Sequence, residues 1–199
     1  MANTVILDLG NVVLGIDFRR VFNYWAEASG AEVQRFHDRW EMCEAYSAHE
    51  TGELDFPGYA EVLADRFDVA LSVEDWHQGW NSLWLKPFNE VVELLPALKE
   101  RYQLYAFSNT NPTHEAYFRE HFADALDPFH EVYTSSGLGY RKPHAKSFSQ
   151  LCRHIGVAPE QAIFVDDSLE NITGAKAAGL HAHHRQGGVE VAELLAELL

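Results

Sequence analysis

The chain has 199 residues, enough for one core domain with a substantial insertion, and its 47% hydrophobic and 23% charged residues are typical of a globular protein. A formal net charge of −15 disfavours nucleic acid and anionic membranes as partners, because the surface field would repel both. We expect a cytoplasmic protein with reduced thiols, because no leader or bilayer-spanning apolar run is found and Cys43 and Cys152 lack metal-ligand spacing.

The first predicted element is a short apolar strand, Thr4 to Leu7, which leads into Asp8 and turns at Gly10 and Asn11. Such a run is typical of a covered parallel strand, and ligands of open α/β sheets bind at the carboxyl ends of strands. Asp8 is therefore a candidate nucleophile or metal ligand. A strand-end carboxylate that caps the next element is the alternative, and this stretch alone does not decide between the two.

After this strand the pattern changes to one helix after another, and the segment contains all five tryptophans. We expect an inserted helical cap over residues 15–87 and a core domain formed by residues 1–14 and 88–199. Most of the aromatic side chains in the insertion are expected in its core rather than against a ligand. Asp55 and Ser72 are predicted to begin two of its helices as N-caps.

From residue 88 onward helices and strands alternate, which predicts parallel strands joined by crossover helices. The expected strands cover residues 103–107, 131–134, 162–165 and 180–183. The expected helices cover residues 91–98, 113–123, 144–156, 169–178 and 189–198. The predicted fold class is α/β, a doubly wound, Rossmann-like parallel sheet with an all-helical cap inserted after the first strand.

Polar side chains stand at the ends of three predicted strands, and a basic loop lies between two of them. They are Asp8, Ser108, Asn109, Asp166 and Asp167, with Lys142 in the loop. The carboxyl ends of parallel strands meet at one edge of a sheet, so we expect these residues in one crevice. Three carboxylates placed together repel one another unless a cation lies among them, and Mg²⁺ prefers such hard oxygen ligands.

The order of these motifs resembles the haloacid dehalogenase-like hydrolase superfamily over the whole chain. The stretches that carry the resemblance are residues 8–13, 108–111, 141–143 and 164–171. Within the superfamily they look most like the bacterial α-D-glucose-1-phosphate phosphatases, and more distantly like the phosphatase domain of soluble epoxide hydrolases. The resemblance implies a phosphatase that acts on a small phosphorylated metabolite, such as glucose 1-phosphate.

By this resemblance, Asp8 attacks the phosphoryl group and forms an aspartyl-phosphate that water later hydrolyses. Ser108 and Asn109 would donate hydrogen bonds to the phosphoryl oxygens, and Lys142 would supply a fixed cation. Phosphoryl transfer needs these two things above all, a positioned nucleophile and neutralisation of the equatorial oxygens.

The resemblance also implies Mg²⁺ as cofactor. The ion would be held by Asp8, by the backbone carbonyl of Gly10 and by Asp167. Asp166 would act on the metal through water or hold Lys142, and Asn171 would orient the loop by hydrogen bonding.

The sequence departs from most phosphatases of the superfamily at Gly10, where they carry an aspartate that serves as general acid and base. Such a group is worth roughly 10²–10⁴-fold in rate. Asp17 is the nearest acidic residue that could replace it, although a helix N-cap is the favoured interpretation. The histidines of residues 181–184 lack acidic neighbours in sequence, which disfavours a metal site there.

Two other functions stay open at this point. A dehalogenase would need no acid at Gly10, but it would leave the Asp166 and Asp167 pair unexplained. A non-catalytic relative that binds a phosphorylated ligand is the other alternative.

The cap is expected to admit only small molecules, with His49, Glu50 and Trp84 near the substrate. Solvated loop positions are the alternative for His49 and Glu50. The sequence does not predict the oligomeric state.

Overall fold

A computed structural model describes residues 2–199 and shows five parallel strands in the order β5-β4-β1-β6-β7. The strands are β1 (Thr4–Leu7), β4 (Gln103–Ser108), β5 (Glu131–Thr134), β6 (Ala162–Asp166) and β7 (His181–His184). The central strand β1 pairs with β4 and β6, and Leu7 aligns with Ala106 and Val165. The first polar residues after β1, β4 and β6 therefore lie at one edge of the sheet, as predicted.

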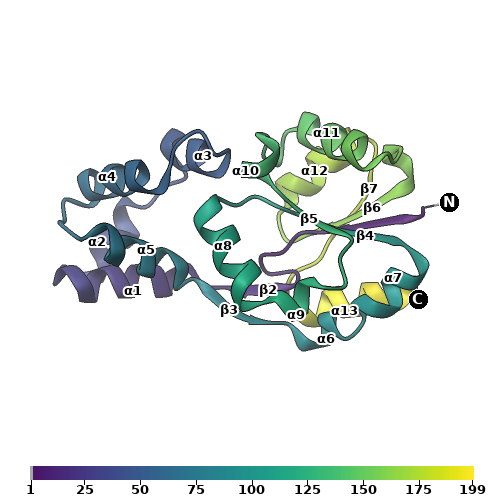
Figure 1. Cartoon of the computed structure of the whole chain (residues 1–199), viewed down its shortest axis with the longest axis horizontal. Helices are drawn as coiled ribbons and strands as arrows, with labels where there is room; N and C mark the ends of the chain where they lie inside the picture. The colour runs from purple at the N-terminus through teal and green to yellow at the C-terminus, as the bar shows by residue number, and fades with distance from the viewer. Residues whose placement is uncertain (1) are drawn as a thin grey trace.

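Helices cover both faces of this sheet, which confirms the predicted α/β class (Figure 1). The core helices are α6 (Asn89–Val92), α7 (Leu95–Arg101), α8 (Pro112–His121), α9 (Ala123–Leu126), α10 (Ser135–Leu138), α11 (Ala145–Ile155), α12 (Leu169–Ala177) and α13 (Gly187–Leu198), with a 3₁₀ turn at Pro159–Gln161. Successive residues of β1 point to opposite faces. Ile6 packs in the cluster that contains α11 and α12, whereas Val5 and Leu7 pack in the cluster that contains α7 and α13.

Two helix predictions differ from the structure in detail. The helix expected over residues 91–98 is divided into α6 and α7, and Pro96 lies in the first turn of α7, where its fixed φ is tolerated. The helix expected over residues 113–123 ends at His121, and the short α9 follows it.

An antiparallel ribbon that sequence patterns did not predict leads from the sheet into the helical segment. Its strands are β2 (Leu14–Ile16) and β3 (Trp84–Pro87). Between them the chain forms α1 (Phe18–Ser29), α2 (Val33–Arg39), α3 (Glu44–Glu50), α4 (Phe56–Phe67) and α5 (Val73–Asn81). These helices lie together at one end of the molecule (Figure 1).

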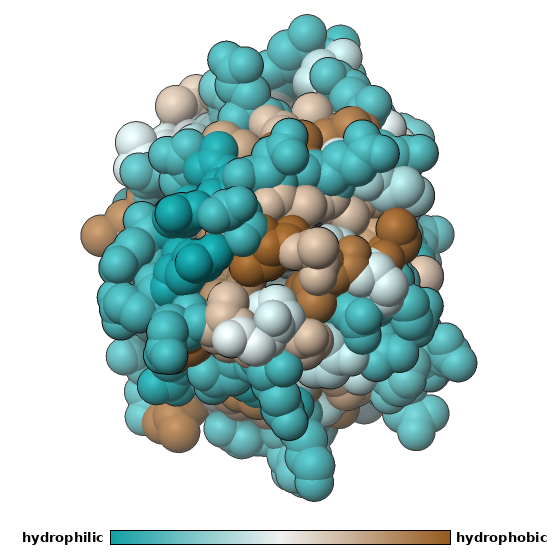
Figure 2. Space-filling view, turned by 90° about the vertical axis from the view of Figure 1, so that its left-hand side faces the viewer, coloured by the Kyte–Doolittle hydropathy of each residue, from teal (hydrophilic) through white to brown (hydrophobic). Residues whose placement is uncertain are grey.

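The aromatic side chains of this segment form its core, as expected. Trp25, Trp76 and Trp80 are almost fully buried, and the ring of Trp25 stacks on that of Trp80 at 5.9 Å between centroids. Asp55 and Ser72 cap α4 and α5 through the backbone N–H groups of Gly58 and Asp75, which confirms both predicted caps. The outer face of this end carries an apolar area surrounded by hydrophilic side chains (Figure 2).

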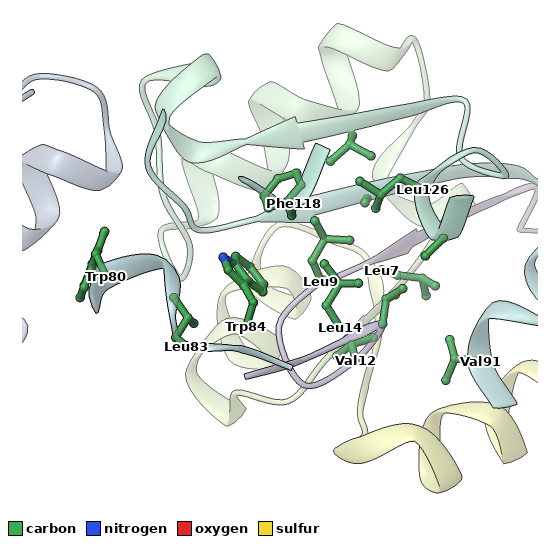
Figure 3. Packing of buried hydrophobic residues seen from close by; sticks show 14 of the residues in the cluster. Leu7, Leu9, Val12, Leu14, Trp80, Leu83, Trp84, Val91, Phe118 and Leu126 are labelled. Atoms are coloured by element: carbon green, nitrogen blue, oxygen red, sulfur yellow. The ribbon is translucent and has the colours of Figure 1, made fainter. Parts of the chain in front are cut away.

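The hydrophobic core continues from the sheet to the ribbon. Leu9 and Leu14 lie beside Trp84 (Figure 3), and the Trp84 ring meets Phe118 of α8 edge to face at 5.6 Å between centroids. The base of the helical segment is therefore packed against the end of β1. Within residues 2–199, none of the helices combines the length and the apolar character that crossing a bilayer requires.

Candidate active site

Lys142 is the centre of the polar cluster at the carboxyl ends of the strands. Its ammonium donates hydrogen bonds to Asp8 Oδ1 at 2.8 Å, to Asp166 Oδ2 at 2.6 Å and to the carbonyl oxygen of Phe107 at 2.8 Å. The side chain is only 1% exposed. All three ammonium hydrogens thus have an acceptor, which fixes a cation between two carboxylates.

Asn109 holds the loop that carries Lys142. Its Nδ2 donates to the carbonyl oxygen of Lys142 at 2.9 Å, and its Oδ1 accepts the backbone N–H of Lys142 at 2.8 Å. On the other side of the loop, Gly174 of α12 faces the carbonyl of Pro143 so closely that any side chain would collide. The contact with the Lys142 carbonyl uses one of the two Nδ2 hydrogens of Asn109, which also lines the cavity beside Asp8, so its role as a phosphate donor stays a prediction.

Asp166 is fully buried at the end of β6 and is held by several donors. One oxygen accepts the backbone N–H of Ser168 at 2.8 Å, and Asn171 Nδ2 lies 3.0 Å from both carboxylate oxygens. Together with Lys142 these donors occupy the carboxylate. Of the two roles expected for Asp166, the structure shows the second, holding Lys142, and it shows the expected hydrogen bonding by Asn171.

Asp167 is oriented by residues that sequence reasoning missed. Asn11 adopts a left-handed backbone with φ of 55° and donates from Nδ2 to Asp167 Oδ2 at 3.2 Å. His184 Nε2 donates to the backbone carbonyl of Asp167 at 2.8 Å. The Gly-Asn turn after β1 was a visible signal for Asn11, because asparagine tolerates this conformation.

The oxygens of Asp8, Asp166 and Asp167 lie within 4.8 Å of one another, which tests the expected metal site. Burial, opposed by Lys142 and reinforced by the other two aspartates, raises the pKa of Asp8 to about 7. Burial also raises the pKa of Asp167. Burial alone would lower the pKa of Lys142, but Asp166 and Asp8 outweigh it and raise that pKa. One ammonium leaves negative charge uncompensated, so this all-oxygen donor set fits a divalent cation such as Mg²⁺.

A cavity of about 120 Å³ adjoins the cluster and lies between the sheet and the helical segment. The predicted site residues that line it are Asp8, Gly10, Ser108, Asn109, Lys142 and Asp167. Tyr46, Glu50, Leu83 and Trp84 line it from the helical segment and ribbon, and His114 lines it from α8. The structure thus brings together residues from both parts of the chain.

His114 is a buried, neutral component of this wall. Its Nε2 donates to the carbonyl of Trp80 at 3.0 Å, and Nδ1 accepts from Asn111 at 3.1 Å. Burial lowers the pKa of His114 to about 3. No sequence pattern distinguished this histidine from the others in the chain.

Asp17 lies outside the cavity and is the N-cap of α1, the interpretation that the sequence favoured. Its carboxylate accepts the backbone N–H of Arg19 at 3.0 Å and forms an ion pair with the Arg19 guanidinium at 2.8 Å. The hydrogen bond from the Arg19 side chain lowers the pKa of Asp17. An ionised, solvent-facing cap is a poor replacement for the acid missing at Gly10.

The space beside Gly10 is occupied by Ile16 of the ribbon. A Cβ at Gly10 would lie 3.2 Å from Ile16 Cδ1, which is tighter than ordinary van der Waals contact. A side chain at position 10 would therefore require the end of the Ile16 side chain to shift by a few tenths of an ångström.

The two residues at the end of α3 have different environments, although neither is a solvated loop residue. Glu50 is 4% exposed and lines the cavity. His49 does not line it: its Nδ1 donates to the carbonyl of Leu54 at 2.9 Å, and its ring stacks on Tyr59 at 4.7 Å between centroids. The expectation that His49 meets the substrate is therefore wrong in this arrangement, whereas Glu50 and Trp84 lie where it requires.

Comparison with known proteins identifies the family of the chain. A family of haloacid dehalogenase-like hydrolases matches residues 2–179. D-ribitol-5-phosphate phosphatase of Bacteroides thetaiotaomicron is 25% identical over 208 aligned residues, which cover 100% of this chain and 99% of that protein. Glyceraldehyde 3-phosphate phosphatase of Methanopyrus kandleri is 34% identical over 119 residues, 56% of this chain and 48% of that protein. Neither name is that of the glucose-1-phosphate phosphatases, so the narrower resemblance is not shown by these two relatives.

Solved structures show the same fold. A haloacid dehalogenase family enzyme of B. thetaiotaomicron, in complex with magnesium and inorganic phosphate, superimposes with a TM-score of 0.83 at 21% identity, over 94% of this chain and 96% of that one. The L-2-haloacid dehalogenase of Xanthobacter autotrophicus superimposes with a TM-score of 0.68 at 20% identity, over 92% of this chain and 77% of that one. With the family match over most of its length, the chain belongs to the haloacid dehalogenase-like hydrolases.

Proposed function

We propose that this protein is a Mg²⁺-dependent phosphatase that hydrolyses a small phosphorylated sugar or polyol through an aspartyl-phosphate on Asp8. The observation that carries the proposal is the buried Lys142 ammonium, which touches both Asp8 and Asp166 at the wall of a small cavity. A fixed cation beside a strand-end carboxylate suits transfer of a phosphoryl group, whose equatorial oxygens carry the charge.

In this mechanism an oxygen of Asp8 attacks phosphorus and a new P–O bond forms. The P–O bond to the leaving group breaks, and the departing oxygen takes its proton from water, because Gly10 has no acidic side chain. Lys142 contacts Oδ1 at 2.8 Å, so Oδ2 is the proposed attacking atom. The Ser108 hydroxyl, which lines the same cavity, donates to a phosphoryl oxygen. Water then hydrolyses the aspartyl-phosphate and releases inorganic phosphate.

Asp8, Asp167 and the backbone carbonyl of Gly10 are the proposed Mg²⁺ ligands. Asp166 is fully engaged by Lys142, Ser168 and Asn171, so we assign it to positioning. When bound, the ion supplies positive charge that balances the carboxylates and the phosphate. The protein residues alone position the nucleophile and Lys142.

The helical segment, residues 15–87, is proposed to act as a cap that limits substrate size. Tyr46, Glu50 and Trp84 enclose the cavity from this side, and an enclosed cavity excludes water and large substrates. The names of the two curated relatives, which act on ribitol 5-phosphate and glyceraldehyde 3-phosphate, support a small polyhydroxy substrate. Glucose 1-phosphate remains a candidate, because its anomeric leaving group needs little protonation and no side chain is present at Gly10 to supply it.

The proposed location is the cytoplasm, which the two unpaired cysteines support. The dehalogenase alternative is less favoured, because that chemistry would not use the carboxylate of Asp167 beside Asp8.

Phosphate release from glucose 1-phosphate, glucose 6-phosphate, ribitol 5-phosphate, a nucleotide and a phosphotyrosine peptide, with Mg²⁺ and with EDTA, tests this proposal. We expect turnover of the sugar and polyol phosphates only when Mg²⁺ is present. The matched control is Asp8→Asn, which keeps the side-chain volume and removes the nucleophile. Phosphate release by this variant, or equal hydrolysis of the peptide, would contradict the proposal.

A further inference from the structure

Within residues 2–199, one ion pair links the cap to the core, next to the Lys142 loop. The Arg141 guanidinium donates to Glu50 Oε2 from Nε at 2.9 Å and approaches it with Nη2 at 2.8 Å. A third guanidinium nitrogen lies 3.5 Å from Ser47 Oγ. The side chain of Glu50 is 5% exposed and that of Arg141 is 23% exposed, so one partner is buried and the other reaches solvent.

This ion pair stands between two hollows. Glu50 lines the inner cavity with Asp8, whereas Arg141 and Ser47 line an outer groove of about 900 Å³. The helix α3 separates the two, since Tyr46 and Glu50 face inward at a spacing of four residues while Glu44 and Ala48 line the groove. Glu50 of the inner cavity and Arg141 of the groove touch directly, so the ion pair is the point where the linings of the two hollows meet.

The inner cavity is too small for a whole sugar phosphate. Its volume of about 120 Å³ lies well below the roughly 300–1,000 Å³ of pockets that hold small organic ligands. A phosphoryl group beside Asp8 and Lys142 takes up much of this space. The hydroxyl-bearing remainder of a substrate must then extend past Glu50 and Arg141 into the groove.

The backbone at this point is anchored, so a side-chain movement is the simplest way to open the site. Ser135 Oγ donates to the carbonyl of Glu50 at 2.6 Å and accepts the backbone N–H of Thr110 at 2.9 Å. Both contacts tie the end of α3 to the core beside the strand ends. Glu50 is thus held in place while the longer, more exposed Arg141 is able to move.

We propose that Glu50 and Arg141 determine specificity: the substrate's hydroxyl groups part the ion pair, donate hydrogen bonds to the Glu50 carboxylate and accept them from the Arg141 guanidinium. The two side chains offer the acceptor and the donors that a polyol requires. A leaving group without hydroxyls gains nothing from them, because it leaves both charged groups without new partners. This inference rests on the proposed phosphatase function and names the residues that select its substrate.

The test compares kcat/KM for ribitol 5-phosphate and glucose 1-phosphate with that for acetyl phosphate, which carries no hydroxyl group on its leaving side. The variants are Glu50→Gln and the double variant Glu50→Gln with Arg141→Met, and Glu61→Gln on the exposed face of α4 is the charge-matched control. The double variant removes both charges together, because removing one partner of a buried ion pair leaves the charge of the other without compensation. Circular dichroism verifies folding.

We expect the double variant to lose about 10- to 100-fold in kcat/KM for the polyhydroxy substrates, as for lost hydrogen bonds to charged groups, and less than threefold for acetyl phosphate. Glu50→Gln should show a smaller loss of the same selectivity, which keeps the test available if the double variant does not fold. Equal losses on all substrates, or faster turnover of the polyhydroxy substrates, would overturn the inference. If the wild type releases no phosphate even from acetyl phosphate, the proposed function fails instead.

Discussion

Replacement of Lys142 by methionine separates the proposed catalytic role of this residue from its structural role. Methionine keeps most of the aliphatic stem, which packs near the rings of Phe107 and Phe164, and removes only the ammonium. The loss leaves Asp8 and Asp166 without their shared cation. Both the reaction rate and the free energy of unfolding are expected to fall, for different reasons.

The magnitudes follow from burial and geometry. Lys142 is 1% exposed and contacts two carboxylates, and removal of one partner from a buried ion pair costs about 3–5 kcal/mol. Proteins of this kind are stable by only about 5–15 kcal/mol, so the variant should remain folded but become clearly less stable. Loss of one preorganised electrostatic contact to the transition state should slow the reaction by about 10²–10³-fold.

Urea denaturation followed by circular dichroism gives the stability, and phosphate release at saturating Mg²⁺ gives the rate. Lys146→Met is the matched control, because Lys146 is an exposed lysine four residues further along the chain, with its ammonium over the ring of Tyr140. It should change stability by less than about 0.5 kcal/mol. Adding Asp8→Asn to Lys142→Met should restore part of the stability and none of the activity. A Lys142→Met variant with near-normal turnover, or a double variant with additive losses, would refute the reasoning.

Three further predictions concern other parts of the site. Asp167→Asn should raise the Mg²⁺ concentration needed for half-maximal activity more than Asp166→Asn does, as a magnesium titration would show. Asp166→Asn should lower the melting temperature more than Asp167→Asn does, as a thermal melt would show. The opposite order in either measurement would contradict the assignment. The pKa of His114 is lowered to about 3, so its imidazole stays neutral in the folded state. In the unfolded chain the imidazole takes up a proton below its ordinary pKa of 6.5, so stability should fall as the pH falls from 6.5 towards 3. Between pH 7.5 and 5.5 the wild type should lose about 1.4 kcal/mol more than His114→Gln, as urea denaturation at both pH values would show, and equal losses would disprove the assignment. Asp17→Asn should leave kcat/KM unchanged for esters of good and poor leaving groups alike, because asparagine also caps α1; a selective loss with poor leaving groups would return Asp17 to the role of acid.

The sequence alone predicted the strands that end at the candidate site. Asp8, Asp166 and the Ser108–Asn109 pair each follow a short apolar run, and the period of such runs and the turns that end them are local properties of the chain. In a parallel sheet the carboxyl ends of the strands share one edge, so the strand assignments also predicted that these residues meet. The N-caps at Asp55 and Ser72 were predictable for the same reason, since a cap involves only the next three residues.

The partners of these residues depended on the tertiary structure. Asn109 and Lys142 are 33 residues apart, and Glu50 and Arg141 are 91 residues apart. No local pattern distinguishes an asparagine amide that binds phosphate from one that holds a loop. The ribbon of β2 and β3 was also not predictable from sequence patterns, because its strands have only three and four residues and are separated by the whole helical segment.

The missing side chain at Gly10 shows the difference most directly. The sequence showed that an acid is absent, but only the packed structure places Ile16 beside the vacant position and Glu50 across the cavity. The ends of the strands are predictable from local periodicity in the sequence. Contacts between side chains of distant segments depend on how the helical segment packs against the sheet. The strand that ends at Asp8 was therefore predictable from its own residues, whereas the other walls of the cavity beside it were decided by the fold.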